Sequence, residues 1–349
     1  MKKKTVSLLQ LLSDFFMVYL PTVRGASHNT ITSYQYTFQL LFEYMLEIEG
    51  LPPEKVGFGN LTDGTVVRFL NWFETSRGCS VKTRNQRRAA IASFAKYALK
   101  KAFNESIAFS SEVIDIPKKK APKGNTVKYF TKEELEILLK LPDTKKKIGQ
   151  RDAVLLSVLY SSGARAQELC DLTVNDISFG NPSVIRLFGK GCKGRSITVP
   201  EGCALLLKKY LESRGLTIGR DEFKLRHIFS SQTHEKMTIS CVEEIVKKYV
   251  KRAKSDHPNL YRNPGYSPHS FRHSVSVHML ECGVSLPVIQ AFLGHESISS
   301  TMIYASITPE LANKYLRDRD LHAGDLIAGS VEEKMSVRLP FLGGIKKHW

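Results

Sequence analysis

The feature that most constrains the fold of this chain is a lysine-rich segment without periodicity, VIDIPKKKAPKGNTVKYF at 113–130. It carries two prolines, one glycine and five lysines. Proline breaks helices, and like charges repel and extend a chain. The 349 residues also exceed what one hydrophobic core usually organises. The sequence therefore predicts a first domain at 1–110, an exposed linker at 111–128, a second domain at 129–320 and a tail at 321–349.

The first domain has a helical pattern throughout. Apolar residues recur at helical spacing in three segments, at 30–46, 66–73 and 87–99. The start, MKKKTVSLLQLLSDFFMVYL, imitates a secretory signal, but Gln10 and Asp14 interrupt the apolar run and favour an amphipathic helix that packs inward. We predict an all-α domain of four or five helices. No stretch is apolar for about 20 residues, so we expect no transmembrane span.

The second domain mixes helical and strand patterns. It opens at Thr131 as a helix N-cap with Glu134 three residues later, which is a capping box. Residues 183–200, SVIRLFGKGCKGRSITVP, have β-rich ends around a Gly/Lys centre and predict a hairpin with a basic turn. Further helices are predicted at 153–160, at 239–253 and from 269 to about 315.

The charge balance predicts a polyanionic partner. The chain has 51 Lys and Arg against 34 Asp and Glu, a formal charge of +17. Nucleic acid and an anionic membrane are the two candidates. The six cysteines form no C-x-x-C pair, which is typical of reduced thiols and predicts a cytoplasmic protein.

Four short segments carry candidate chemistry: GARAQEL at 163–169, FGKGCKGR at 188–195, PHSFRHS at 268–274 and LGHESISSTMIYA at 293–305. Each one alone is a weak signal. In this order they resemble the boxes of the tyrosine recombinase, or phage integrase, family: an arginine, a hairpin lysine, H-x-x-R, L-G-H and a tyrosine. The matching residues are Arg165, Lys190, His269, Arg272, His295 and Tyr304.

The resemblance implies a fold, an activity and partners. The fold is an all-α, SAM-like core-binding domain followed by a mixed α+β catalytic domain. The activity is site-specific recombination of double-stranded DNA by a tetramer on paired sites, through a 3′-phosphotyrosyl link and a Holliday junction. Tyr304 would attack, Lys190 would protonate the departing 5′ oxygen, and His269 would assist proton transfer at Tyr304. No cofactor is implied, and the chain has no G-x-x-x-x-G-K-[ST] motif for ATP.

Physical chemistry supports this site independently of the resemblance. Charge builds on the non-bridging oxygens of a phosphodiester under attack, and arginine forks at Arg165 and Arg272 suit those oxygens, so no metal is needed. His269 and Arg272 share one helix face, and Ser267 and Pro268 fit an N-cap and first helical position before them. We expect the surrounding cations to favour the phenolate of Tyr304.

Several assignments within the site stay open. Lys193 lies in the same turn as Lys190 and is the alternative proton donor. Glu168 and His273 are predicted to support the catalytic residues, although an ion pair or a core hydrogen bond would explain them equally well. A zinc site at His269, His273 and His278 is disfavoured, because the segment lacks H-E-x-x-H and Arg272 would repel a cation.

Basic residues outside the catalytic boxes are candidates for contacts with the DNA backbone. Some crowd a helix N-terminus, where they oppose the helix dipole, a mild cost that a bound phosphate would relieve; a solvated helix end is the alternative. Others lie in the linker and in the hairpin turn. The candidates are Lys82, Arg84, Arg87, Lys118, Lys119, Lys120, Lys193 and Arg195.

Three questions of function remain open at this point. A type IB topoisomerase uses the same tyrosine chemistry, and a regulator that binds DNA without cleaving it would share the charge. The biological task could be integration, excision or transposition of a mobile element, or Xer-type dimer resolution. The tail at 321–349 could dock on a neighbouring protomer or fold on its own domain, and Tyr304 could act in cis or in trans.

Overall fold

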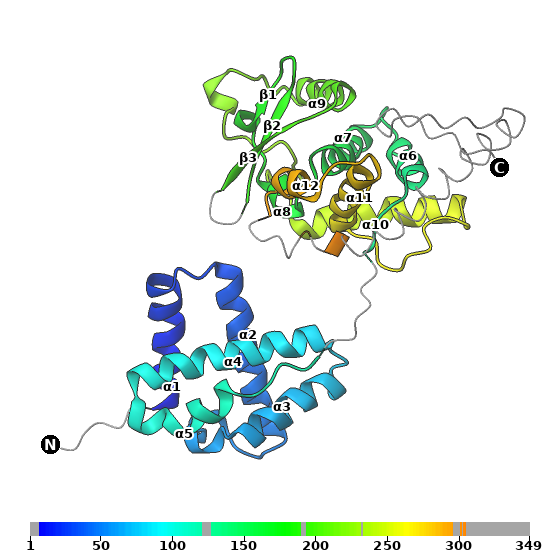
Figure 1. Cartoon of the computed structure of the whole chain (residues 1–349). Helices are drawn as coiled ribbons and strands as arrows, with labels where there is room; N and C mark the ends of the chain where they lie inside the picture. The colour runs from blue at the N-terminus through cyan, green and yellow to red at the C-terminus, as the bar shows by residue number, and fades with distance from the viewer. Residues whose placement is uncertain are drawn as a thin grey trace, which may run out of the picture. The chain divides into compact units, whose positions relative to one another are not determined.

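The structure is a computed structural model that describes residues 7–120, 127–189, 193–231, 233–295, 301, 303 and 304. The chain divides into two compact units, Met1–Gly124 and Asn125–Trp349 (Figure 1). The first unit is helical and the second combines helices with a small sheet, as the sequence predicts.

The described part of the first unit forms five α-helices. They are α1 (Leu8–Asp14), α2 (His28–Glu47), α3 (Asp63–Ser76), α4 (Val81–Lys101) and α5 (Phe103–Ile114), with a π-helix at Phe15–Val23 and 3-10 turns at Pro53–Lys55 and Phe58–Asn60. Hydroxyl side chains cap three of these helices: Ser7, Thr62 and Ser80 each accept a backbone N–H of the first turn.

Aromatic side chains fill the core of this unit. Phe94 of α4 lies at its centre, and its ring meets Phe15 and Phe38 edge-on, with centroids 5.4 and 5.3 Å apart. Leu8 and Leu12 are also buried, which confirms that the first helix packs inward. In the described ranges we find no helix with the length and apolar character needed to cross a membrane.

The start of the predicted linker belongs to the helical unit. Helix α5 continues to Ile114, and the Ile116 side chain is buried. Arg88 donates hydrogen bonds of 2.7 Å to the carbonyl oxygens of both residues. Asn85 accepts the backbone N–H of Lys119 at 3.0 Å. Residues 111–120 are therefore held by the first unit, a tertiary contact that composition does not reveal.

The described part of the second unit combines seven α-helices with a three-stranded sheet, which lies at one edge of the unit (Figure 1). The helices are α6 (Lys132–Lys140), α7 (Lys147–Ser162), α8 (Ala166–Asp171), α9 (Glu201–Ser213), α10 (Ile239–Asp256), α11 (Pro268–Glu281) and α12 (Leu286–Leu293). Two 3-10 turns lie at Val174–Asp176 and Asp221–Phe223. Helix α7 carries the fully buried Leu155 and Leu156 and packs against α9 and α11.

The sheet is antiparallel in the order β1 (Ile177–Ser178), β2 (Val184–Phe188) and β3 (Gly194–Thr198). This confirms the predicted hairpin. Leu187 pairs with Arg195, and the N–H of Gly189 donates to the carbonyl oxygen of Lys193 at 2.9 Å across the start of the turn.

The capping box predicted at the start of α6 is present and also has a tertiary role. Thr131 and Glu134 cap the helix reciprocally. The Glu134 carboxylate also accepts the backbone N–H of Tyr261 at 2.6 Å and the hydroxyl of Tyr266 at 3.2 Å. These bonds fix the loop that leads into α11.

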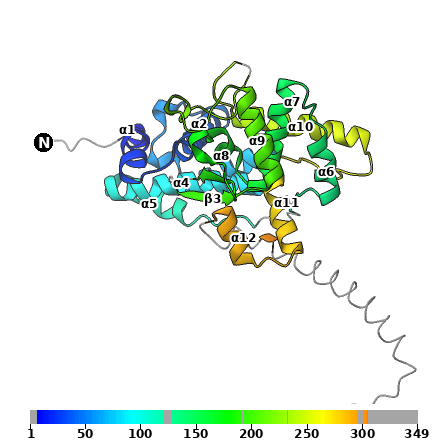
Figure 2. The same cartoon turned by 90° about the horizontal axis from the view of Figure 1, so that it is seen from above.

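The helix predicted from 269 to about 315 is interrupted. Ser267 and Pro268 begin α11 as predicted, but α11 ends at Glu281, and α12 lies beside it (Figure 2). The backbone at Gly283 has φ +79°, which glycine adopts at little cost and which a helix cannot continue through. The tail, including the predicted segment at 321–349, lies outside the described residues.

Candidate active site

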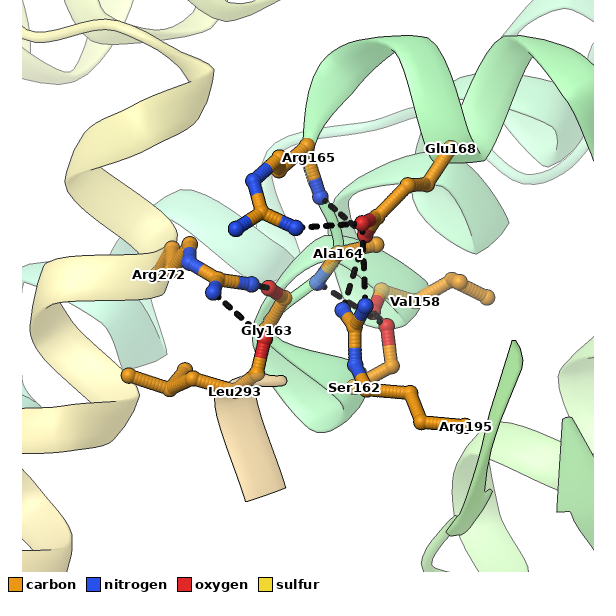
Figure 3. A network of polar contacts seen from close by, with 9 residues as sticks. All are labelled: Val158, Ser162, Gly163, Ala164, Arg165, Glu168, Arg195, Arg272 and Leu293. Atoms are coloured by element: carbon orange, nitrogen blue, oxygen red, sulfur yellow. Dashed lines mark hydrogen bonds and ion pairs between the residues drawn. The ribbon is translucent and has the colours of Figure 1, made fainter. Parts of the chain in front are cut away.

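Arg165 stands at the junction of α7 and α8. Helix α7 ends at Ser162 and is capped by Gly163, which has φ +58°. Gly163 is packed against Leu293, so that a Cβ there would lie 3.2 Å from the leucine side chain. Two residues later Arg165 is the N-cap of α8. Its backbone N–H donates to Glu168 Oε2 at 2.9 Å and its Nη1 donates to Oε1 at 2.7 Å (Figure 3). The tight turn thus presents this guanidinium at the start of a helix.

Arg272 reaches the same turn from α11. Its side chain is fully buried, and its Nη1 and Nη2 donate 2.6 Å hydrogen bonds to the carbonyl oxygens of Gly163 and Leu293 (Figure 3). Its Nε is buried without a hydrogen-bond partner among the described residues. Burial, together with the charges of Arg165 and Arg195, lowers the pKa of Arg272 to about 9, so the guanidinium is charged at neutral pH.

Glu168 separates two of the positive charges. Its side chain is buried and accepts hydrogen bonds from Arg165 and from both Nη groups of Arg195. Burial alone would raise the pKa of the carboxyl, but the bonds from Arg195 and Arg165 outweigh burial and lower it. Glu168 is therefore an anion within a group of arginines, and its role in supporting the catalytic residues stays a prediction.

The structure brings His273 directly to Tyr304. The Nδ1 of His273 lies 2.8 Å from the tyrosine hydroxyl oxygen. The ring of the exposed His269 is 4.4 Å from that of His273, centroid to centroid. Burial, followed by the charges of His269, Arg272 and His295, lowers the pKa of His273 to about 4. His273 is thus a neutral imidazole at neutral pH, and its low pKa makes it a weak base in this closed conformation.

Tyr304 is held as a phenol in this structure. Its side chain is 1% exposed, and burial raises its pKa despite a hydrogen bond with Ser276 and the nearby charge of Arg272. The sequence led us to expect that cations would favour the phenolate. Here desolvation outweighs them, because a buried anion loses the solvation that water provides.

His295 lies between the arginines and the tyrosine segment. It follows Gly294, which has φ +62° at the end of α12 as the predicted turn requires. Its Nδ1 is 2.9 Å from the Thr301 hydroxyl oxygen. Burial, then the charges of Arg272 and Arg165, lowers its pKa to about 4, so this ring is also neutral at neutral pH.

The remaining catalytic candidates are the two lysines of the hairpin turn. Lys190 lies outside the described residues. Lys193 is described and its side chain is exposed. The choice between them stays a prediction.

All three arginines proposed for DNA contact have largely buried side chains. Arg87 is buried and donates to the Ser33 carbonyl oxygen at 2.9 Å and to Thr37 Oγ1 at 3.1 Å. Arg84 is buried beside Glu74, with 3.5 Å between Nε and Oε2. The third is Arg195, which is bound to Glu168. Sequence reasoning placed all three on the surface, where the structure keeps Lys82, Lys118, Lys119, Lys120 and Lys193.

The three histidines considered for a zinc site do not come together around one point. His278 hydrogen-bonds to the Tyr160 hydroxyl at 2.9 Å, while His273 contacts Tyr304. Within the described ranges, no three His, Cys, Asp or Glu side chains are grouped so that they could hold a metal ion.

Comparison with known proteins finds matches along most of the chain. Residues 128–310 match the phage integrase family, and residues 14–102 match the phage integrase N-terminal SAM-like domain. The putative integrase/recombinase y4rC of Sinorhizobium fredii is 32% identical over 325 residues, which cover 92% of this chain and 94% of that protein. Tyrosine recombinase XerD of Listeria monocytogenes is 28% identical over 297 residues, 85% of this chain and 94% of XerD.

Solved structures share the fold. The XerH site-specific recombinase in a post-cleavage complex with palindromic difH substrate superposes with a TM-score of 0.65 at 22% identity, over 87% of this chain and 84% of that one. The Tn1549 transposon integrase in complex with transposon right end DNA gives a TM-score of 0.64 at 18% identity, over 89% and 99% of the two chains.

Proposed function

The chain belongs to the phage integrase family and is a site-specific tyrosine recombinase, and from this premise we propose that Tyr304 is its nucleophile toward double-stranded DNA. The observation that carries the proposal is the 2.8 Å contact between the Tyr304 hydroxyl and the neutral His273, beside the buried Arg272. A phenol needs a base to become a good nucleophile, and His273 takes this role once DNA has opened the site and the burial that lowers its pKa is relieved.

The proposed cleavage step is an in-line displacement at phosphorus. The Tyr304 oxygen forms the new P–O bond while its proton passes to His273 Nδ1, and the bond from phosphorus to the 5′ oxygen breaks. The 5′ oxygen keeps the electron pair and takes a proton from Lys190. Reversal by the 5′ hydroxyl of a second strand rejoins the DNA without an external energy source.

The other site residues stabilise this step. Arg165 and Arg272 bind the two non-bridging oxygens once DNA has opened the site. The Nε of Arg272, which is buried and has no hydrogen-bond partner among the described residues, then becomes a donor for them. His295 donates a further hydrogen bond. His269, which the sequence suggested as the assistant to Tyr304, receives the proton from His273 and passes it to solvent, since its ring is exposed and adjacent to that of His273.

Burial of the nucleophile requires a rearrangement before cleavage. With 1% of its side chain exposed, Tyr304 cannot meet a phosphate in the conformation described. We propose that binding of the recombination site releases the tyrosine segment, so that Tyr304 attacks in its own protomer or in a neighbour. A tetramer on paired sites, joined by a Holliday junction, then exchanges the strands in the cytoplasm.

Covalent trapping tests this function without knowledge of the target sequence. A pool of nicked duplexes with a randomised half-site is incubated with the protein, and adducts that resist SDS are recovered and sequenced. We expect adducts with a defined sequence from the wild type and none from Tyr304→Phe. Adducts from Tyr304→Phe would contradict the nucleophile. Relaxation of arbitrary supercoiled plasmid would favour a type IB topoisomerase instead.

We propose integration, excision or transposition of a mobile element as the biological task. The likeness to a protein named as a putative integrase/recombinase supports it. Xer-type dimer resolution is the second candidate, because several relatives carry the name XerC or XerD. The selected site decides between them: it should match the ends of an element flanking the gene in the first case and a chromosomal site in the second.

A further inference from the structure

The Arg195 side chain forms an ion pair within the protein, although Arg195 follows a basic turn in the sequence. Only 11% of its side chain is exposed, and its guanidinium is paired with the Glu168 carboxylate. Nη1 donates to Oε1 at 2.9 Å and Nη2 donates to Oε2 at 2.7 Å (Figure 3). Both Nη groups are therefore engaged by a carboxylate, which neutralises the charge that a DNA phosphate would otherwise attract.

The same carboxylate determines the orientation of Arg165. Each oxygen of Glu168 accepts one bond from each arginine: Oε1 from the two Nη1 groups, and Oε2 from Arg195 Nη2 and the Arg165 backbone. If Arg195 were removed, the buried carboxylate would keep a negative charge that is only partly compensated, which is energetically costly. The Glu168 carboxylate would then attract the Arg165 guanidinium more strongly and turn it away from solvent, to which 41% of the Arg165 side chain is exposed.

The aliphatic part of Arg195 contacts a second segment of the site. A Cβ added to Gly294 would lie 3.0 Å from Arg195 Cδ, so the backbone before His295 packs directly on this side chain. The hairpin turn reaches the cluster as well, since a Cβ on Gly189 would lie 3.4 Å from Glu168 Oε1. Arg195 therefore lies where the start of α8, the hairpin turn and the end of α12 meet.

We propose that Arg195 is a positioning residue for strand cleavage. Its paired hydrogen bonds hold Glu168, and through Glu168 they orient Arg165. Arg195 itself touches neither the phosphate nor the nucleophile. This inference rests on the proposed function, because it assigns Arg165 to the cleavage step.

A double-mutant cycle on Arg195 and Glu168 tests the proposal, with single-turnover cleavage of the trapped duplex as the readout. Arg195→Gln should slow cleavage by on the order of tenfold or more, because misplaced groups lose near-attack geometry. Its Kd for the duplex should change by less than about twofold, since no phosphate contact is lost. In the Glu168→Gln background the same substitution should cost little, because no buried charge then needs Arg195.

Three further variants keep the test interpretable. Arg195→Lys keeps the charge without the paired geometry and should recover part of the rate. Arg186→Gln is the matched control, because Arg186 is exposed on the neighbouring strand β2 and donates to the Asn175 carbonyl oxygen instead. It should cleave like the wild type. If Arg195→Gln does not fold, Arg195→Lys and the double variant, whose neutral amides can pair, still report the coupling.

The pH profile separates positioning from a merely structural role. Loss of Arg195 removes the largest influence that opposes burial at Glu168, so the pKa of this carboxyl should rise. Cleavage by Arg195→Gln should then weaken on acidification at a pH where the wild type is unaffected, and the double variant should lack this change. Profiles that differ only by a constant factor would overturn the proposal.

Two other outcomes have distinct meanings. An equal loss from Arg195→Gln in both backgrounds would overturn positioning and indicate a direct phosphate contact. No Tyr304-dependent adduct from the wild type would overturn the proposed function and this inference with it. The same cycle measured on the free energy of unfolding would still show whether Arg195 and Glu168 are coupled, so the two failures can be told apart.

Discussion

The Nδ1 of His273 and the hydroxyl oxygen of Tyr304 are 2.8 Å apart, although the two residues are separated by 31 positions in the chain. His269, which the H-x-x-R spacing singles out, is instead exposed one helical turn earlier. The ring nitrogen in contact with the proposed nucleophile therefore belongs to the histidine that follows Arg272.

Replacement of His273 should impair cleavage more than replacement of His269. His273→Gln removes the base that contacts the tyrosine, and loss of general base catalysis costs roughly 10²- to 10⁴-fold in rate. His269→Gln should cost less, because its ring acts one step later. Single-turnover cleavage of the selected duplex measures both. A larger loss from His269→Gln would return the role to His269.

Acidification should destabilise the free protein. The pKa of His273 and that of His295 are both lowered to about 4, below the usual value near 6.5 of an unfolded chain. Between these values the unfolded state binds more protons, so the free energy of unfolding rises with pH. Stability should be complete above about pH 6.5 and fall toward pH 4.

Urea unfolding at several pH values measures this dependence. His273→Gln and His295→Gln should each flatten it, and the two effects should not be additive, because each ring feels the charge of its neighbours. A wild type whose unfolding free energy is constant over this range would contradict the burial of neutral imidazoles.

Substitutions of two basic residues of α4 should affect different properties, one the stability of the protein and the other its binding to DNA. Arg87 is buried on Ser33 and Thr37, so Arg87→Ala should destabilise the protein by about 2 kcal/mol through unsatisfied acceptors and lost packing. Lys82 is exposed on the same helix. Lys82→Ala should leave the unfolding free energy nearly unchanged and reduce the log–log salt slope of binding by about 0.9 if Lys82 contacts a phosphate.

Thermal unfolding and binding across a salt series check both variants. A stable Arg87→Ala protein with weakened DNA binding would place Arg87 at the interface after all. An unchanged salt slope for Lys82→Ala would leave the solvated helix end as the explanation of that charge.

Gly163→Ala should damage the arginine cluster through the backbone. The position has φ +58°, and a Cβ there would lie 3.2 Å from Leu293, Phe292 and Val275. We expect a loss of roughly 1–3 kcal/mol in stability and slower cleavage, because the Gly163 carbonyl oxygen holds Arg272. Gly202→Ala in α9 is the control: no atom lies within 4 Å of its added Cβ. Equal stability of the two variants would refute the steric argument.

Local signals in the sequence predicted the parts of the fold that depend on neighbours in the chain. The capping box at Thr131 and the Ser267–Pro268 start of α11 are both present, because a helix end is satisfied by residues within one turn. The hairpin between β2 and β3 is present for a similar reason. The order of the boxes also predicted the family.

Contacts between distant segments were not predictable in the same way. The sequence around Arg195 and Arg87 does not distinguish them from arginines on the surface. Only the fold brings a buried carboxylate to Arg195 and a backbone carbonyl oxygen to Arg87 as hydrogen-bond acceptors. The contact between His273 and Tyr304 depends on how the segment after α12 returns to α11. For the break before α12, the Cys282–Gly283 pair was a signal that helical periodicity concealed.

The closed position of Tyr304 has a consequence for the cell that contains the enzyme. A nucleophile that can cleave phosphodiester bonds would damage a genome if it were exposed at all times, and the reversibility of the reaction offers little protection against random nicks. Tyr304 is buried in the free protein. On the proposed mechanism, its exposure depends on the arrival of the correct DNA, so that copies of the enzyme can accumulate between recombination events without injuring the chromosome.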